Sequence, residues 1–401
     1  MILAAVAIFF AAFLLSLAGT FLARRYARRL GMMDDPGHRK VHTVATPRNG
    51  GIGIFWGFAL PLLVGIIALP LLADHIIWHL PISFYFTGQP EGYFALRLFG
   101  FLIPIPEQFV TYLPGMRAHV SLALLLLAAT FAIHILGLLD DKKPLAPWPK
   151  LIAQIAIAAA LVFIGEYADP IGGGRGGAFR ILTSLGFIPS AILSILWIVA
   201  LTNAFNFLDN MDGLSAGVAF ICAAMFLIAA VFNQQWFVAA LLLLFMGATL
   251  GFLCFNFPPA SIFMGDGGSM ILGFVLSVLT IRTTYCDAGN PNVLHHWYSV
   301  FMPLFVMAVP LYDLVIVMVL RVAKGRSPMT GDTNHFSHRL TRHGFSKRTA
   351  VLIIYAVTFA TGFSAPLLAR VDDASAILLA GQLLAILVVI GILERVGEHT
   401  T

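Results

Sequence analysis

The chain has 401 residues, of which 59% are hydrophobic and 11% charged, and its formal net charge is +5 at pH 7. A soluble domain usually carries about a quarter charged residues, so this composition excludes a soluble globular protein. The positive charge follows the membrane topology derived below, and we expect no nucleic acid among the partners.

Apolar segments recur along the whole chain. A helix needs roughly 20 apolar residues to cross a bilayer core, and lipid offers no partners to backbone groups, so a helical bundle is expected. The predicted spans are residues 2–22, 51–72, 119–139, 151–167, 187–206, 213–232, 235–255, 268–284, 298–320, 349–367 and 376–393. We therefore predict an all-α polytopic membrane protein with about 11 transmembrane helices, organised as one domain over residues 1–401.

The charges around the first span predict its orientation. No positive charge precedes this span and four arginines (24, 25, 28 and 29) follow it, which is the reverse of a secretory signal peptide and places the N-terminus outside. Threading the spans from there puts the C-terminus in the cytosol. The 24 lysines and arginines then all lie inside except Arg97, Arg117, Arg175, Arg180, Arg282 and Arg370. This distribution predicts a multi-pass protein of the inner (plasma) membrane.

Two stretches on the outer side interrupt the regular spacing of spans. Residues 73–118 form a long loop with aromatic, partly amphipathic segments, which we expect to lie along the membrane interface. Residues 172–177 read GGGRGG but lack the GK[ST] ending of a phosphate-binding loop, so a flexible turn is predicted there. The three cysteines form no CxxC pair, which argues against a disulfide framework or a zinc site.

Polar residues concentrate at the cytosolic ends of the odd-numbered spans. Asp140–Asp141 end the third span, NAFNFLDNMDGLSAG (203–217) ends the fifth, FNFPPASIFMGDGGS (255–269) follows the seventh, and GDTNHFSHRLTRHG (331–344) follows the ninth. Every odd span arrives at the cytosolic face, so all four clusters lie on one side. The basic segment 34–54 joins them there, and we expect one shared site.

The residue types in these clusters suit phosphoryl transfer. Aspartates are hard oxygen ligands for Mg²⁺ or Mn²⁺, and His, Arg and Lys supply charge and donors for phosphate oxygens. The inventory predicts a metal-assisted phosphoryl-transfer site at the membrane surface, with Mg²⁺ or Mn²⁺ as cofactor.

Each cluster also has a purely structural interpretation. The Asp pair suits the end of a solvated helix, GDGG around Asp266 suits a turn, His134 suits a core position with its hydrogen bonds satisfied, and residues 335–339 suit a solvated basic loop. The cluster at the end of the fifth span resists such an explanation, because polar groups are costly in lipid and four of them recur at spacing three, on one side of a continuing helix. These four are Asn203, Asn206, Asp209 and Asp212. The string DNMDG lacks the third acid and the distal Glu of a calcium-binding loop, which excludes an EF-hand.

Together, the segments DDPGHRKVHTVATPRNGG, GLLDDKKPL, NAFNFLDNMDGLSAG, FNFPPASIFMGDGGS and NHFSHRL resemble the polyprenyl-phosphate N-acetylhexosamine-1-phosphate transferase family, of the glycosyltransferase family 4 type. They occur in family order from Asp34 to Gly344. The resemblance implies transfer of a sugar 1-phosphate from a UDP-N-acetylhexosamine to polyprenyl (undecaprenyl) phosphate, with release of UMP, as the first membrane step of a cell-envelope glycan pathway. It implies these two substrates and the lipid bilayer as partners, and a homodimer is one candidate assembly.

The resemblance also implies a role for each motif residue. Asp140 matches a carboxylate that acts as base or nucleophile, with Asp141 as its partner, and Asp266 matches a Mg²⁺ ligand. Phe263 matches an aromatic residue that stacks on uracil. The remaining matches fall into three groups: nucleotide- and metal-side residues (Asn203, Asn206, Asp209 as a second metal ligand, and Asp212), a basic group near the phosphates (Lys40 and His42), and a sugar- and diphosphate-binding loop within 321–348 (His335, His338 and Arg339).

The last of these motifs separates branches of the family. The branch that uses UDP-N-acetylglucosamine carries a His-x-His-His-Arg-Leu string, and this chain has His335-Phe336-Ser337-His338-Arg339-Leu340, with Ser337 in place of the middle histidine. The alternative branch, phospho-N-acetylmuramoyl-pentapeptide transferase, has three histidines followed by Phe-Glu and ten spans. The sequence is therefore nearer the undecaprenyl-phosphate N-acetylglucosaminyl-1-phosphate transferase branch.

Two further classes of function remain open at the level of sequence. A secondary transporter would place its polar residues near the bilayer midplane on broken helices, and Asp313 within the ninth span is the residue best suited to that function. Asp313 equally suits support of the cytosolic site. A structural membrane scaffold would require no coincidence of acids and histidines on one face.

Overall fold

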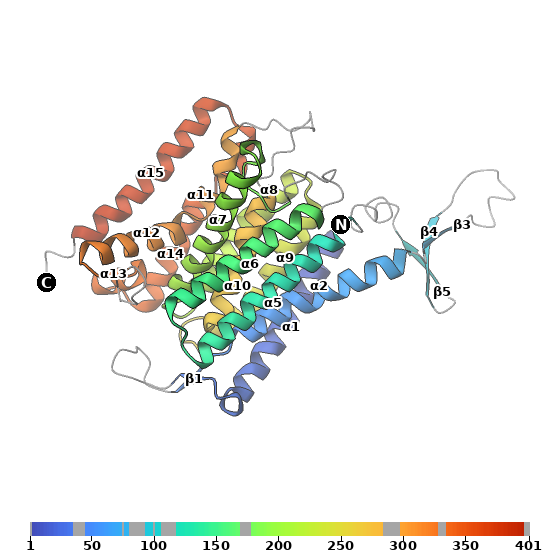
Figure 1. Ribbon diagram of the computed structural model, residues 1–401, viewed down its shortest axis with the longest axis horizontal. Coiled ribbons are helices and arrows are strands. Elements are labelled where there is room, and N and C mark those ends of the chain that lie inside the picture. Colours follow the sequence, from blue (N-terminus) through green and yellow to red (C-terminus); the bar gives the residue numbers. More distant parts are fainter. Residues whose placement is uncertain are drawn as a thin grey trace.

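A computed structural model describes residues 2–34, 45–73, 76–79, 93–98, 101–105, 118–168, 178–283, 297–327 and 334–396. Most of these residues are helical, and the long helices form a bundle (Figure 1). The α-helices are α1 (Ile2–Leu30), α2 (Gly51–Ala73), α5 (Val120–Lys142), α6 (Pro147–Ala168), α7 (Phe187–Leu208), α8 (Leu214–Phe232), α9 (Trp236–Asn256), α10 (Asp266–Thr283), α11 (Met302–Val306), α12 (Ala308–Ala323), α13 (Phe336–Arg342), α14 (Lys347–Gly362) and α15 (Asp373–Val396). The 3-10 helices are η1 (Thr183–Leu185), η2 (Trp297–Phe301) and η3 (Ala365–Arg370).

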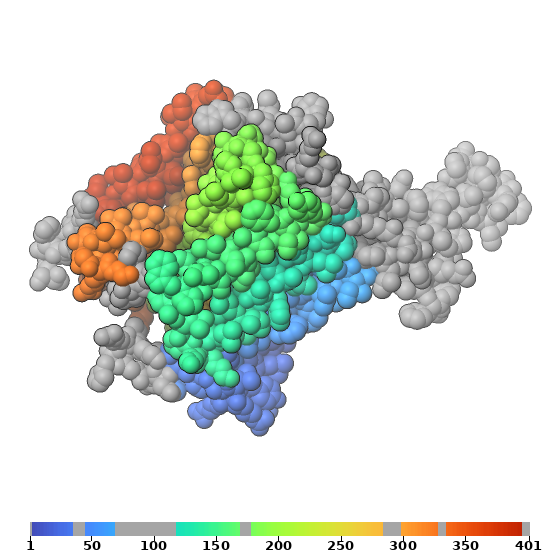
Figure 2. Space-filling model, in the orientation of Figure 1, coloured from blue at the N-terminus to red at the C-terminus, as the bar shows by residue number. Residues whose placement is uncertain are grey.

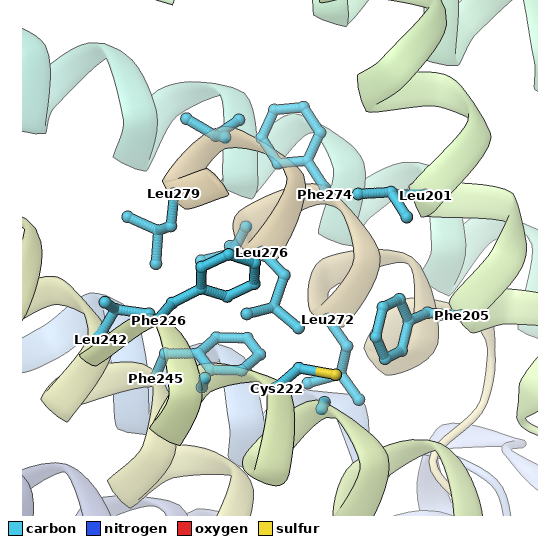
Figure 3. Packing of buried hydrophobic residues seen from close by; sticks show 14 of the residues in the cluster. Leu201, Phe205, Cys222, Phe226, Leu242, Phe245, Leu272, Phe274, Leu276 and Leu279 are labelled. Carbon is cyan, nitrogen blue, oxygen red and sulfur yellow. The ribbon is translucent and has the colours of Figure 1, made fainter. Parts of the chain in front are cut away.

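The centre of the bundle is α10, which packs against α2, α5, α7, α8 and α9. Almost every residue of α10 is buried. Figure 3 shows apolar side chains of the surrounding helices gathered in one core with those of α10, among them Phe205, Phe226, Phe245 and Phe274. Because protein encloses α10, the position of its first residue, Asp266, is fixed relative to the neighbouring helices.

Two glycines allow this close packing at the N-terminal end of α10. A Cβ on Gly137 of α5 would lie 2.5 Å from the carbonyl oxygen of Asp266, and a Cβ on Gly51 of α2 would lie 2.3 Å from the backbone nitrogen of Gly268. Both distances are far below van der Waals contact, and the opposing atoms are backbone atoms that cannot turn away. Glycine therefore brings α2 and α5 directly against the first turn of α10.

Each predicted apolar span coincides with a helix or a bent pair of helices. By length and composition, 9 helices among the described residues can cross a membrane, or up to 10 if the pair Tyr298–Val306 and Ala308–Ala323, bent by 73°, is one span. The predicted span 268–284 corresponds to α10, which has 18 residues and is not among those 9. The chain is a multi-pass membrane protein of all-α class, and a total of eleven spans and the orientation stay predictions.

Short strands lie at both ends of the bundle (Figure 1). At the end where α1 finishes, β1 (Met33–Asp34) pairs antiparallel with β2 (Thr46–Pro47). Beyond the end of α2, strands β3 (Ile76–His79), β4 (Tyr93–Leu98) and β5 (Phe101–Ile105) form an antiparallel sheet in the order β3-β4-β5. The described part of loop 73–118 is thus a small sheet that projects from the bundle. The sequence predicted amphipathic segments at the membrane interface there and no strands.

Candidate functional site

Asp141 connects the end of α5 to the start of α10. Its carboxylate oxygens accept hydrogen bonds from the backbone N–H groups of Asp266 (2.8 Å) and Gly267 (2.9 Å). The first N–H groups of a helix have no partner within the helix, and the helix dipole favours negative charge there. Arg48 adds an ion pair, with its Nε 3.1 Å from Oδ1 of Asp141, whose side chain is only 1% exposed. Asp141 therefore holds the backbone of Asp266 in place.

Asp140 has different partners. Its Oδ1 accepts a hydrogen bond from the backbone N–H of Leu145 (2.6 Å), and its Oδ2 accepts one from Nζ of Lys150 (2.7 Å). Lys150, in the first turn of α6, also donates to Oδ2 of Asp266, and Arg48 lies 3.2 Å from the other oxygen of Asp266. Two cations thus bridge Asp266 to Asp140 and to Asp141. We call Asp140, Asp141, Asp209 and Asp266 the acid cluster.

Asn206 extends the acid cluster toward α7. Its amide donates to Oγ of Ser269 in α10 (2.9 Å), and its carbonyl oxygen lies 3.5 Å from Nζ of Lys150. Asn203, one turn earlier, instead donates to the side chain of Gln154 in α6 (2.6 Å). Asn206 therefore contacts the cation that bridges the acids, whereas Asn203 joins α7 to α6 behind them.

The continuing helix expected through residues 203–212 is interrupted. α7 ends at Leu208, and the chain then turns through Gly213, whose φ is +74°, into α8. Asp212 accepts a hydrogen bond from the backbone N–H of Ala260 (2.9 Å) and so braces the neighbouring loop. The prediction that four polar residues share one helical face is wrong for Asp209 and Asp212, because this turn redirects the chain.

Asp209 lies at the start of this turn, close to the other acids. Burial raises its pKa to about 8, with the charge of Asp266 as the next cause and Asp141 and Asp212 acting in the same direction, while Arg48 opposes the shift. Within the described residues no hydrogen bond or ion pair to its side chain is formed. Among the described residues, Asp209 is therefore the member of the acid cluster that forms no direct ion pair.

The segment that carries Phe263 is held by its backbone. The N–H of Phe263 donates to the carbonyl oxygen of Pro47 (2.8 Å), and its own carbonyl accepts from Gly50 (3.0 Å). These bonds place Phe263, whose side chain is half-buried, beside the segment that carries Arg48. Stacking of this ring on uracil stays a prediction. Lys40 and His42, the predicted basic group near the phosphates, lie outside the described residues.

The predicted substrate loop 321–348 contains a helix. The sequence predicted a loop around residues 335–339, whereas Phe336–Arg342 form α13. Asp313 of α12 fixes the start of α13: its Oδ1 accepts from the backbone N–H of Phe336 (2.6 Å), and its Oδ2 lies 2.8 Å from Nδ1 of His335. Asp313 therefore supports residues 335–339, which we call the histidine loop. Of the two interpretations that the sequence left open for Asp313, this is support of the cytosolic site.

His338 and Arg339 differ in their surroundings. Burial lowers the pKa of His338, and the nearby charges of His335 and Arg342 lower it further, so this ring favours its neutral form. Arg339 is buried, and its Nη2 lies 2.8 Å from Oε1 of Glu394 in α15. Its Nη1 donates to the carbonyl oxygen of Asn334 (2.5 Å).

α13 lies against the turn that follows α7. The hydroxyl of Ser337 donates to the side-chain oxygen of Asn210, the residue after Asp209. The ring of His335 meets that of Phe207, the residue after Asn206, edge to face at 6.1 Å between centroids. The end of α7 thus contributes to the acid cluster and touches the histidine loop, so the two groups of polar residues flank one short segment.

The charges and oxygen atoms of the acid cluster decide whether it can hold a metal ion. Four carboxylates face two cations, Arg48 and Lys150, which leaves two negative charges within the described residues when all four are ionised. No three His, Cys, Asp or Glu side chains among those residues surround a common metal position, and oxygens of Asp140 and Asp266 point to the cations instead. The hard oxygen donors and the charge excess fit one divalent cation, which Asp266 and Asp209 would hold.

Sequence patterns alone missed three residues, two that contact the acid cluster and one that contacts α13. Arg48 was included only as part of the basic segment 34–54, and Lys150 only as cytosolic positive charge, although Lys150 stands ten residues after Asp140 at the start of an apolar span. Glu394 lies just after the last predicted span, 376–393, and was given no role. It is the last acid of an otherwise apolar helix, and a charge in such a place is a signal of a buried partner.

Comparison with known proteins adds the family. A model of glycosyl transferase family 4 matches residues 123–284, the part of the chain that carries the four aspartates of the acid cluster. The decaprenyl-phosphate N-acetylglucosaminephosphotransferase of Mycobacterium tuberculosis (strain H37Rv) is 31% identical over 344 residues, which are 83% of this chain and 74% of that protein. The chain belongs to glycosyl transferase family 4. The resemblance seen in its motifs is thereby confirmed.

This family 4 chain is similar to other proteins with related names. The probable undecaprenyl-phosphate N-acetylglucosaminyl 1-phosphate transferase of Bacillus subtilis (strain 168) is 29% identical over 349 residues, covering 86% of this chain and 80% of that protein. The undecaprenyl-phosphate alpha-N-acetylglucosaminyl 1-phosphate transferase of Escherichia coli (strain K12) is 25% identical over 347 residues, covering 85% and 78%. All three names belong to the branch indicated by the histidine loop.

Proposed function

We propose that this family 4 enzyme transfers N-acetylglucosamine 1-phosphate from UDP-N-acetylglucosamine to a polyprenyl phosphate and releases UMP. The observation that carries the proposal is the acid cluster, bridged by Arg48 and Lys150 and situated at one end of a membrane bundle. The names of the similar proteins, each with a polyprenyl phosphate and N-acetylglucosamine, support the choice of acceptor and sugar.

The proposed reaction brings two anions together. An oxygen of the lipid phosphate attacks the β-phosphorus of the UDP-sugar, the bond from that phosphorus to the bridging oxygen breaks, and UMP leaves with the bonding electrons. Lys150 and Arg48 reduce the repulsion between the two phosphates, because their charges lie where the carboxylates hold them. A divalent cation held by Asp266 and Asp209 would supply further neutralisation of the diphosphate.

Asp140 has two roles compatible with its position. As a general base it would take the proton of the lipid phosphate, and as a nucleophile it would form a covalent intermediate first. Lys150 holds one oxygen of Asp140 and the backbone of Leu145 the other, so the carboxylate is orientated in either case. We propose direct attack by the lipid phosphate, with Asp140 as the base.

The proposal places the site at the cytosolic face of the inner (plasma) membrane. Arg28 and Arg29 lie in the last turn of α1, which is the end that leads into β1 and to Arg48. Basic residues mark cytosolic ends of spans, and UDP-sugars are soluble nucleotides that reach the enzyme from the aqueous side.

The test uses purified protein, polyprenyl phosphate, Mg²⁺ and a panel of UDP-sugars, with UMP release as the readout. We expect the highest kcat/KM with UDP-N-acetylglucosamine, loss of turnover in EDTA, and recovery with Mg²⁺ or Mn²⁺. Asp266→Asn should be inactive although folded. Preference for a UDP-N-acetylmuramoyl-pentapeptide would assign the other branch, and no UMP release with any donor would refute the proposed activity.

A further inference from the structure

The last helix, α15, packs loosely along its length. It passes along the edge of the bundle toward α12 and α13 (Figures 1 and 2). Most of its large apolar side chains are exposed, including Ile377, Leu378, Leu384, Val388, Val389, Ile392 and Leu393. Glu394 is the exception in its last turn, since it is 8% exposed whereas its neighbour Leu393 is 63% exposed. An apolar helix therefore directs a carboxylate into the protein.

The buried Glu394 contacts two other helices. One carboxylate oxygen lies 2.8 Å from Nη2 of Arg339 in α13, and the other accepts a hydrogen bond from the hydroxyl of Tyr312 in α12 (2.7 Å). Its backbone carbonyl lies 3.3 Å from Nε2 of His343. Burial of an unpaired carboxylate is costly, so this position is explained by its partners and not by the packing of α15.

α13 needs such external support. It has seven residues, and an isolated helix of that length is not stable in water. Asp313 holds its first residue and Asn210 holds Ser337, but both contacts lie in its N-terminal half. Glu394 supplies a third polar contact, at the middle of α13 through Arg339 and just after its last residue through His343.

The contact also reaches the residues predicted to bind the donor. Arg339 donates to the carbonyl oxygen of Asn334, immediately before His335, while it is paired with Glu394. The ion pair therefore ties both the helix and the residue that enters it to α15. His335 and His338 lie on this segment, with ring centroids 6.4 Å apart.

We infer that Glu394 is a positioning residue of the donor site, which holds α13 from α15 so that His335 and His338 meet the UDP-sugar. The inference rests on the proposed function, because it assigns the donor to α13. Glu394 does not contact the acid cluster, so its loss should affect donor binding and leave the phosphoryl chemistry intact. A defect confined to ground-state binding raises KM without lowering kcat.

The chain offers a matched control. Glu166 in α6 pairs with buried Arg180, with two N–H to carboxylate contacts of 2.9 Å. It lies sixteen residues after Lys150, about 24 Å along the helix at 1.5 Å per residue. Glu166→Gln therefore makes the same chemical change in another Glu–Arg pair, one with a buried arginine and a partly buried glutamate, far from α13.

The experiment compares wild type, Glu394→Gln, Glu394→Leu and Glu166→Gln. UMP release gives kcat and the KM of each substrate, and hydrogen exchange of residues 336–342 reports the order of α13 without activity. For Glu394→Gln we expect a donor KM raised about tenfold, kcat and acceptor KM within about twofold of wild type, and about tenfold faster exchange in α13. Glu394→Leu should show a larger rise in donor KM and faster exchange in α13, and Glu166→Gln should change neither quantity.

The inference is overturned if Glu394→Gln leaves donor KM and exchange unchanged, or if Glu166→Gln reproduces both changes. A fall in kcat with unchanged donor KM would also overturn it. Glu394→Gln is almost isosteric, so the test does not depend on whether Glu394→Leu folds. If wild type released no UMP, the proposed function would fail, and the exchange comparison would still decide whether Glu394 holds α13.

Discussion

Asp266 shares its two oxygens between two cations, and those cations reach it from opposite sides of the site. Lys150 comes from α6 with Asp140, and Arg48 comes from the segment before α2 with Asp141. Three carboxylates this close would repel one another strongly without these bridges. The arrangement of the acids therefore depends on residues that are not themselves acidic.

Lys150→Met should lower kcat about 10²-fold, because it removes the cation that fixes Asp140 relative to Asp266 while keeping an unbranched side chain of similar size. The measurement is steady-state UMP release. Lys143→Met is the control, since Lys143 is exposed and directly follows α5, the helix that carries Asp140. Equal activity of the two variants would mean that Lys150 contributes only to the basic surface.

Metal affinity should rise with pH because of Asp209. Its pKa of about 8 keeps the carboxyl protonated at neutral pH, and a cation must displace that proton. A raised pKa means that Asp209 favours folding while protonated, and this contribution is lost as the pH rises through 8. Calorimetry with Mn²⁺ between pH 6 and 9 should therefore show affinity that rises up to about tenfold per pH unit below 8 and then levels off. Asp209→Asn should flatten that rise, and a slope unchanged by this substitution would contradict the assignment.

The sequence predicted which polar residues lie together at the acid cluster, but it did not predict which ion pairs and hydrogen bonds they form. Alternation of spans across a membrane places every odd-numbered end on one face, so Asp141, Asn206 and Asp266 were expected together, and the structure brings them together. The choice of Lys150 as the bridge depends on side-chain directions at the start of α6, which hydrophobic patterning does not encode.

At the scale of elements, the first turn of α10 is the part least tolerant of change. Gly137→Ala should destabilise the protein by about 1–3 kcal/mol and lower kcat, because the added methyl group would meet backbone atoms of Asp266 and Gly267. Thermal unfolding in detergent and UMP release measure the two effects. At Gly65 of α2 a Cβ meets nothing within 4 Å, so Gly65→Ala should be neutral or slightly stabilising. A similar loss in both variants would point to a general effect of glycine removal.

The helices that could be predicted from the sequence are those formed by long apolar runs. Every long helix follows an apolar run, whereas α13 has seven mostly polar residues whose helical form depends on contacts with Asp313, Asn210 and Glu394. Such contacts join positions far apart in sequence, and local propensity is too weak to replace them. The sheet of β3, β4 and β5 was missed for a related reason, since its apolar segments suit a strand as well as an interfacial segment.

The whole molecule should have its acid cluster and its projecting sheet on opposite sides of the membrane. Single cysteines at Arg326 and at Tyr167, introduced after alanine replaces the three native cysteines, report the two sides because both positions are exposed. A membrane-impermeant maleimide should label Tyr167→Cys in intact spheroplasts, and Arg326→Cys only after permeabilisation. The reverse pattern would invert the predicted topology.

The predicted orientation of the bundle rests on charge placement, which can be read directly from the sequence. The enclosure of α10 could not be read from it. Its apolar run resembled the others, yet α10 is surrounded by helices and α15 is largely exposed. Hydropathy alone treats lipid and protein as equivalent surroundings, so it cannot separate a central helix from a peripheral one.

The order of the chain gives the position of Glu394 a consequence for biosynthesis. A ribosome makes α12 and α13 first, and α15 emerges only after α14 has been completed. The histidine loop therefore lacks its contact with Glu394 until the last helix has been inserted and its final turn packs beside Arg339. If Glu394 positions the donor site as inferred, full affinity for the nucleotide sugar is acquired only at the end of membrane insertion.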